Sequence, residues 1–184
     1  MSKTLYAIDV ETTGLNHRDS SLVSIGAVEI MDPTNRFYME CNVWKGSLVE
    51  DVALKINGFS HTDITDNPDK VSEAEMITAF VEWVTQKNAP MMVAHNASFD
   101  RDWVAAACNR AAIKNPFEFR TIDIHSIMYA HLMRLGKDVP GRLSLNACLE
   151  LCGLPKEPNP HNALTGAECN YFIYRHVVFG EHGN

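Results

Sequence analysis

Residues 4–15 read T-L-Y-A-I-D-V-E-T-T-G-L, and this stretch decides how the rest of the chain is interpreted. Its first seven residues are an apolar run rich in strand formers, which predicts a strand that ends in a turn at Gly14. Asp9 and Glu11 are two apart, so on a strand their side chains point to the same face. Asp9 lies inside the apolar run, where an unpaired carboxylate is costly to bury. A metal ion or a buried Arg would relieve that cost; the simpler alternative is an acidic pair that faces solvent.

The hydrophobic pattern predicts an α/β fold around this strand. Residues 22–31 and 36–43 are strand-like and are joined by a turn at Asp32-Pro33-Thr34-Asn35, so the first three strands form an antiparallel section. Further strands are expected at residues 90–94 and 120–124, and helices are expected from Ser72, over 99–112 and 126–135, from Ser144 to Gly153, and from 161 or 162 to 178. The order predicts a mixed central sheet with helices on its faces, in a single domain over residues 1–184.

Composition restricts the class of protein. Of the 184 residues 46% are hydrophobic and 21% are charged, which is typical of a soluble globular domain. No apolar run approaches the roughly 20 residues of a membrane span, and the N-terminus lacks a secretory signal, so a cytoplasmic protein without a membrane partner is expected. The net charge of −7 argues against a basic protein that coats nucleic acid, but it is compatible with carboxylates that bind divalent cations.

The cysteines do not indicate a special site. There are five of them, an odd number, and none forms a C-x-x-C pair. A disulfide framework or a zinc knuckle is therefore not expected. The cluster His61-Thr62-Asp63 lies in a turn-rich segment and is expected to be a surface loop.

A second group of polar residues, His95-Asn96-Ala97-Ser98-Phe99-Asp100, follows the apolar strand at residues 90–94. Asn96 or Ser98 can cap the helix that comes next. Asp100 falls in its first turn, where the helix dipole favours a carboxylate whether or not it takes part in chemistry.

A third segment, His161-Asn162-Ala163-Leu164-Thr165-Gly166-Ala167-Glu168, begins the last helix after Pro158-Asn159-Pro160. The two prolines stiffen the chain in front of His161. An imidazole at the start of a helix can act as a general base, although a capping or surface role is the more common one.

Together the three segments resemble the DEDD-type 3′-to-5′ exonucleases, the DnaQ-like or RNase T-like family. The resemblance covers residues 5–174, and His161, five residues before the last acidic position, points to the histidine subclass. It implies a ribonuclease H-like fold and hydrolysis of phosphodiester bonds at the 3′ end of single-stranded DNA or RNA. Several relatives pair as dimers, so the resemblance leaves a homodimer open. The sequence does not indicate whether the substrate is DNA or RNA, and it does not indicate the biological pathway.

The resemblance also implies roles for individual residues. In this family carboxylates hold two divalent ions, Mg²⁺ or Mn²⁺, against the scissile phosphate. Asp9, Glu11 and Asp100 would be the metal ligands, and His161 would take the proton from the attacking water. The terminal nucleotide would contact backbone groups of Thr12 and Thr13, the side chain of Leu15, and a groove lined by His95, Asn96 and Phe99.

The match fails at one position. The last motif of the family reads H-x-A-x-x-D-A, and this chain has Gly166 in place of the aspartate. Glycine offers no ligand, and in a helix it costs about 1 kcal/mol relative to alanine, so helix stability does not explain its presence.

Several explanations of Gly166 stay open. Glu168 or Asp123 could replace the missing ligand, although Glu168 lies about 200° around the helix. A water could fill the gap and leave a weaker enzyme, or the substitution could be an engineered one. The domain could instead be an inactive module that binds nucleic-acid ends or a protein partner, or a structural subunit with a vestigial groove. Because Asp9, Glu11, Asp100 and His161 are all present, the sequence favours an active exonuclease.

Overall fold

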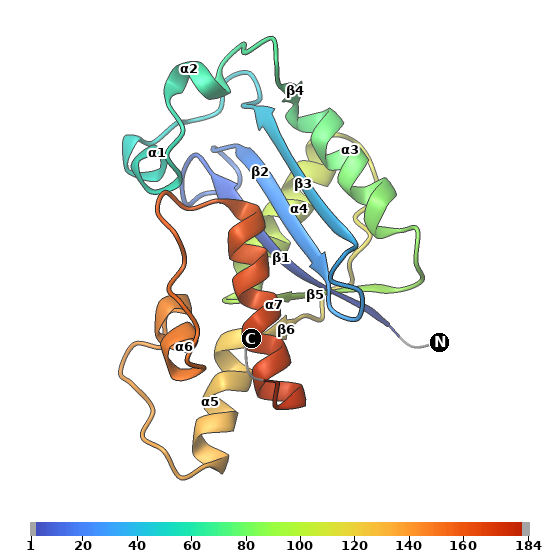
Figure 1. Cartoon of the computed structure of the whole chain (residues 1–184). Coiled ribbons are helices and arrows are strands. Elements are labelled where there is room, and N and C mark those ends of the chain that lie inside the picture. Colours follow the sequence, from blue (N-terminus) through green and yellow to red (C-terminus); the bar gives the residue numbers. More distant parts are fainter. Residues whose placement is uncertain (1–2, 182–184) are drawn as a thin grey trace.

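The computed structural model describes residues 3–181, and a six-stranded mixed sheet runs through its centre (Figure 1). β1 pairs antiparallel with β2, and β2 pairs antiparallel with β3, as the sequence predicted. β5 is parallel to β1, β6 is parallel to β5, and β4 is parallel to β3. Across the sheet the order is β4-β3-β2-β1-β5-β6. The strands are β1 (Thr4–Thr12), β2 (Leu22–Glu29), β3 (Arg36–Asn42), β4 (Val71–Ser72), β5 (Pro90–Ala94) and β6 (Ile122–Asp123).

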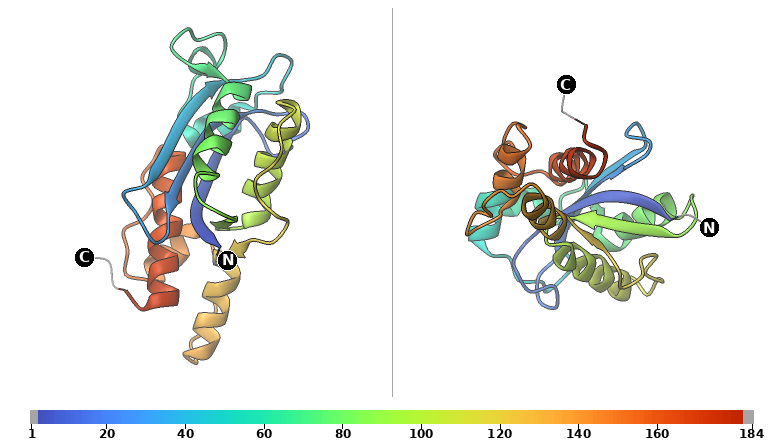
Figure 2. Two further views of the ribbon diagram at one scale, coloured as in Figure 1. Left: turned by 90° about the vertical axis from the view of Figure 1, so that its right-hand side faces the viewer. Right: turned by 90° about the horizontal axis from the view of Figure 1, so that it is seen from below.

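Helices cover both faces of this sheet. The helices are α1 (Asp51–Asn57), α2 (His61–Ile64), α3 (Glu73–Val84), α4 (Ala97–Arg110), α5 (Ile124–Arg134), α6 (Leu145–Leu151) and α7 (Ala163–Phe179). Turned side-on, the sheet stands between α7 on one side and α3 with α4 on the other (Figure 2). The α/β fold with helices on both faces is therefore confirmed. Within residues 3–181, no helix combines the length and apolar character that crossing a membrane requires.

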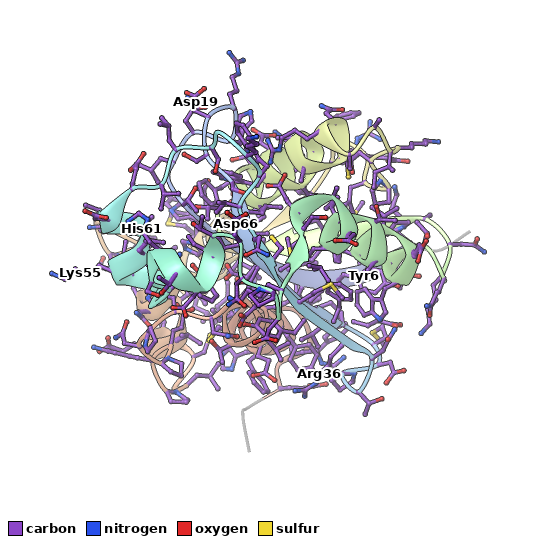
Figure 3. All side chains as sticks on the ribbon, turned by 90° about the horizontal axis from the view of Figure 1, so that it is seen from above. Tyr6, Asp19, Arg36, Lys55, His61 and Asp66 are labelled. Atoms are coloured by element: carbon purple, nitrogen blue, oxygen red, sulfur yellow. The ribbon has the colours of Figure 1, made fainter. Side chains whose placement is uncertain are left out.

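The segment between β3 and α3 holds three elements that the hydrophobic pattern did not predict: α1, α2 and β4. The expectation of a surface loop at residues 61–63 is wrong, because a capping box between Ser60 and Asp63 starts a short helix there. His61 nevertheless lies on the outer rim of the molecule, as does Lys55 of α1 (Figure 3). Helices this short have no long apolar stripe, so caps and packing define them more than periodicity does.

Two apolar clusters hold the helices on the sheet. The first lies between the sheet and α3 with α4 and includes Phe80 and Trp103. The second lies under α5, α6 and α7 and includes Met128 and Ile173. The five cysteines are buried and free, which confirms that they form no disulfide framework.

The first turn of α7 touches the backbone of the sheet at Gly26. Gly26 pairs with Asp9 across β1 and β2. A Cβ atom at this position would lie 2.1 Å from the carbonyl oxygen of Ala163 and 2.3 Å from the amide nitrogen of Leu164. About two turns further along the same helix, the side chain of Asn170 donates to the carbonyl oxygen of Ile8 at 3.0 Å. The start of α7 is therefore fixed directly beside Asp9.

A substitution tests this close approach. We expect Gly26→Ala to lower the free energy of unfolding by about 1–3 kcal/mol, because the new methyl group meets backbone atoms that cannot rotate away. Urea denaturation measures the change. Gly141→Ala is the matched control, since a Cβ there meets nothing within 4 Å, and it should stay within about 0.5 kcal/mol of the wild type. Equal stability of the two variants would show that the close approach of α7 is not required.

Candidate active site

Three carboxylates from the predicted set lie at the end of β1. Glu11 is 8% exposed and Asp100, in the first turn of α4, is 3% exposed. Asp9 is partly buried between them and α7. Burial raises the pKa of Asp9 well above its ordinary value, and the charges of Asp100, Glu11 and Glu157 raise it further. The structure therefore brings Asp9, Glu11 and Asp100 close to one another. A fourth carboxylate, that of Glu157, also lies near them and was not predicted from the sequence.

Among the described residues, this group has no Lys or Arg partner. Burial raises the pKa of Glu11 to about 8, and the charge of Glu157 adds to the effect. Burial also raises the pKa of Asp100 to about 8, although backbone hydrogen bonds from Asp100 and Val10 act in the opposite direction. Within residues 3–181, no Lys or Arg forms an ion pair with any of the four carboxylates.

His161 lies directly before α7, with its side chain 34% exposed. Its backbone amide donates to the carbonyl oxygen of Ile56 at 3.0 Å, at the end of α1. The next residue, Asn162, is the N-cap, and its side chain accepts from the amide of Leu164 at 2.9 Å. The unpredicted helix α1 therefore helps to hold the imidazole at the mouth of the site.

Glu157 is the functional candidate that sequence reasoning missed. Its side chain is only 4% exposed, and its Oε2 atom lies 3.7 Å from Nδ1 of His161. Its backbone amide donates to Oδ1 of Asn146 at 2.9 Å, which fixes the loop between α6 and α7. The surrounding sequence, P-K-E-P-N-P, has no periodicity that would indicate burial. The only available signal was its position four residues before His161.

Gly166 lies directly against the side chain of Asp9. A Cβ atom at this position would lie 2.3 Å from Oδ2 and 2.6 Å from Cγ of Asp9. The carboxylate of Asp9 therefore rests against the backbone of α7, in the space that a side chain at position 166 would occupy. A side chain at position 166 would therefore require the carboxylate of Asp9 to move.

Both residues that could replace the missing ligand make contacts outside this group. Glu168 forms an ion pair with Arg36 on β3. Asp123 accepts hydrogen bonds from the amide of Asn96 at 2.8 Å and from the amide of Ser126 at 3.1 Å. It joins the start of α4 to the start of α5.

The same contacts correct the expected cap of α4. Asn96 occupies the N-cap position with a left-handed backbone, φ +60°, and its side chain makes no capping hydrogen bond. Nor does Ser98 cap the helix, since its hydroxyl donates to the side chain of Asn96. Asp123 accepts from the first amides instead. A residue 27 positions away performs the role, so local sequence could not reveal it.

The residues expected to contact the nucleotide fall into two groups. His95 and Asn96 line a cavity of about 480 Å³, and a ring nitrogen of His95 lies 2.8 Å from the carbonyl oxygen of Leu143. Phe99 does not line this cavity; its ring lies 5.9 Å from that of Trp103. Of the three residues expected to line one groove, His95 and Asn96 therefore share a cavity and Phe99 lies outside it.

The turn after β1 forms the other group. The hydroxyl of Thr12 donates to the carbonyl oxygen of Gly14 at 2.7 Å, and that of Thr13 donates to the carbonyl oxygen of Leu48 at 2.6 Å. Leu15, beyond them, is 81% exposed. The turn is held rigidly, and it presents a large apolar side chain to the solvent.

The chemistry of the four carboxylates fits divalent metal ions. Carboxylate oxygens are the ligands that Mg²⁺ and Mn²⁺ prefer, and buried like charges without a protein cation are costly. Within residues 3–181, no group of three or more His, Cys, Asp or Glu side chains is already arranged as the ligands of one ion. The carboxylates would therefore have to move closer together to bind one ion.

The raised pKa values predict how the metal-free protein responds to pH. Folded Glu11 retains its proton up to about pH 8, whereas an unfolded glutamate releases it near pH 4.5, so this group loses stabilising effect as the pH rises between these values. We expect Glu11→Gln to become more stable relative to the wild type between pH 5.5 and pH 8. Urea denaturation in EDTA measures this difference. Burial lowers the pKa of His95, which changes stability with pH in the opposite direction, but His95 is present in both proteins and its contribution cancels. An equal difference at both pH values would contradict the buried state of Glu11.

Comparison with known proteins places the chain in a family. The exonuclease family model RNase_T matches residues 6–174. Ribonuclease T of Cronobacter sakazakii is 30% identical over 189 residues, which cover 93% of this chain and 79% of that protein. Ribonuclease T of Citrobacter koseri is 30% identical over 188 residues, with 93% and 82% covered.

Solved structures show the same fold. The zinc-bound complex of E. coli Exonuclease I with single-stranded DNA superposes with a TM-score of 0.80 at 14% identity, over 98% of this chain and 41% of that chain. The apo form of Exonuclease I gives 0.78 at 15% identity, over 98% and 43%. This chain spans about two fifths of Exonuclease I. The family match along most of the sequence and this ribonuclease H-like fold show that the chain belongs to the RNase T-like exonuclease family, the DnaQ-like 3′-to-5′ exonucleases.

Proposed function

We propose that the chain is a metal-dependent exonuclease that removes nucleotides from the 3′ end of single-stranded DNA or RNA. The observation that supports this most strongly is the group of three buried carboxylates and the partly buried Asp9 beside His161, with which no Lys or Arg of residues 3–181 forms an ion pair. Both nucleic acids are included because the relatives are named ribonuclease T, whereas Exonuclease I has been solved with single-stranded DNA.

Asp9, Glu11 and Asp100 would hold the metal ions. Bound Mg²⁺ or Mn²⁺ would offset the charge of the scissile phosphate and lower the pKa of the attacking water. Asp9 and Glu11 come from one strand, and Asp100 comes from the start of α4, so the ligands belong to two elements that the core fixes to each other. Such a rigid setting restricts where the phosphate can bind.

His161 would accept the proton of the attacking water. It is the only histidine in the group formed by the end of β1 and the start of α7, among the described residues. Its partial exposure leaves the ring accessible to a substrate, and the carboxylate of Glu157 lies 3.7 Å from its Nδ1 atom. The backbone contact to Ile56 limits how far the ring can move.

The terminal nucleotide would bind against the turn after β1. Backbone groups of Thr12 and Thr13 would contact its sugar, and Leu15 would pack against its base. His95, Asn96 and Phe99 would line the path of the strand, in which His95 and Asn96 face the cavity and Phe99 offers an aromatic ring for stacking.

Shortening of labelled oligonucleotides tests the proposed activity. Single-stranded DNA and RNA labelled at the 5′ end are incubated with the full chain and Mg²⁺ or Mn²⁺. We expect a ladder of products shortened stepwise from the 3′ end, no products in EDTA, and a loss of about 100-fold or more in rate for His161→Ala. His131→Ala, on α5 and outside the site, is the matched control and should retain the rate.

The opposite result would change the assignment. Oligonucleotide binding without shortening in either metal would make the chain an inactive module that uses the same fold. Shortening that His161→Ala leaves unchanged would place the general base elsewhere.

A further inference from the structure

The site lacks one carboxylate of the family pattern, and its usual position is closed. At Gly166 the space for a side chain is taken by the carboxylate of Asp9. Glu168 is paired with Arg36, and Asp123 joins α4 to α5. If a side chain replaces the missing ligand, the contacts of Glu168 and Asp123 favour one from another part of the chain.

Glu157 lies on the side of the site where the missing carboxylate would act. Its charge raises the pKa of Asp9, of Glu11 and of the thiol of Cys169. Cys169 is three residues after Gly166, so the two share one face of α7. The Glu157 carboxylate itself lies 3.7 Å from Nδ1 of His161, directly before the helix turn in which a Cβ on Gly166 would meet Asp9.

The position of Glu157 is built into the fold. Asn146 on α6 accepts its backbone amide at 2.9 Å, and four residues later the amide of His161 is bound by Ile56 of α1. Between them, Pro160 packs on Gly58, where a Cβ would come within 2.6 Å of the proline ring. The loop is thus attached at both ends, and it carries a carboxylate into the interior.

Among the described residues, no Lys or Arg offsets the burial of the Glu157 carboxylate. Within residues 3–181 the only ion-pair partner of its side chain is His161, at 3.7 Å, which is longer than a hydrogen bond. An acidic side chain that is 96% buried and has no Lys or Arg partner points to a cation that binds there.

We propose that Glu157 is a metal ligand of this site and supplies the carboxylate that Gly166 cannot. This inference rests on the proposed function, because it requires the carboxylates to hold divalent metal. Gly166 and Glu157 then form a linked pair: the glycine makes room for Asp9 against α7, and the glutamate restores the fourth carboxylate from the preceding loop.

Binding of Mn²⁺ tests the proposal without reference to activity. The full chain is titrated with Mn²⁺, and free Mn²⁺ is followed by electron paramagnetic resonance. We expect Glu157→Gln to weaken binding by about 10-fold or more. Glu168→Gln is the matched control, since it also removes one negative charge, but from a position on α7 outside the site. Its affinity for Mn²⁺ should stay within about twofold of the wild type. Asp9→Asn reports on the site as a whole and should lose binding.

A second variant and a folding measurement keep the test decisive. Glu157→Asp keeps the charge but withdraws the carboxylate by one methylene group, so it should also weaken Mn²⁺ binding. In EDTA the Tm of Glu157→Gln should equal or exceed that of the wild type, because one of several crowded charges is gone.

The outcomes separate the two proposals. If Asp9→Asn loses Mn²⁺ while Glu157→Gln and Glu157→Asp bind it like the wild type, Glu157 is not a ligand and the metal-dependent function still stands. Glu157 would then act only by positioning His161. If the wild type itself binds no Mn²⁺, the metal-dependent function fails, and the role of Glu157 fails with it.

Discussion

Several acidic side chains lie close together at the end of β1, and the elements around them have to accommodate this concentration of like charge. Asp9, Glu11, Asp100 and Glu157 come from one strand, one helix and one loop, and no Lys or Arg among the described residues pairs with them. In the metal-free protein these carboxylates lower their mutual repulsion by retaining protons. The pKa of each of the four is accordingly raised. Under the proposed function, a bound divalent cation would offset this repulsion.

Two glycines make this crowding sterically feasible. Gly26 lets the first turn of α7 rest on the sheet backbone, and Gly166 lets the carboxylate of Asp9 rest on α7. Asn170 then ties the helix to β1 through the carbonyl oxygen of Ile8. Because α7 approaches so closely, His161 at its start and Glu157 in the loop before it reach the same site. A change in one glycine would therefore be felt at several functional groups.

The sequence was most informative where function follows from local pattern. Asp9 and Glu11 on one strand, and Asp100 in the first turn of α4, could be placed because strand and helix periodicity fix their positions. It was uninformative where a contact joins distant segments. Glu157 lies in a proline-rich loop, Asp123 caps a helix that begins 26 residues earlier in the chain, and α1 is too short to show an apolar stripe. The reason for Gly166 was also out of reach, since it depends on the rotamer of Asp9.

Thermal unfolding of the full chain with and without Mn²⁺, at pH 5.5 and at pH 8, tests most directly whether the buried carboxylates are a cation site. A ligand that binds only the folded state raises the Tm, and carboxylates that are more fully ionised bind a cation more tightly. If the four carboxylates hold metal, Mn²⁺ raises the Tm at both pH values and raises it more at pH 8. An identical Tm with Mn²⁺ and with EDTA at pH 8 would contradict the metal site itself.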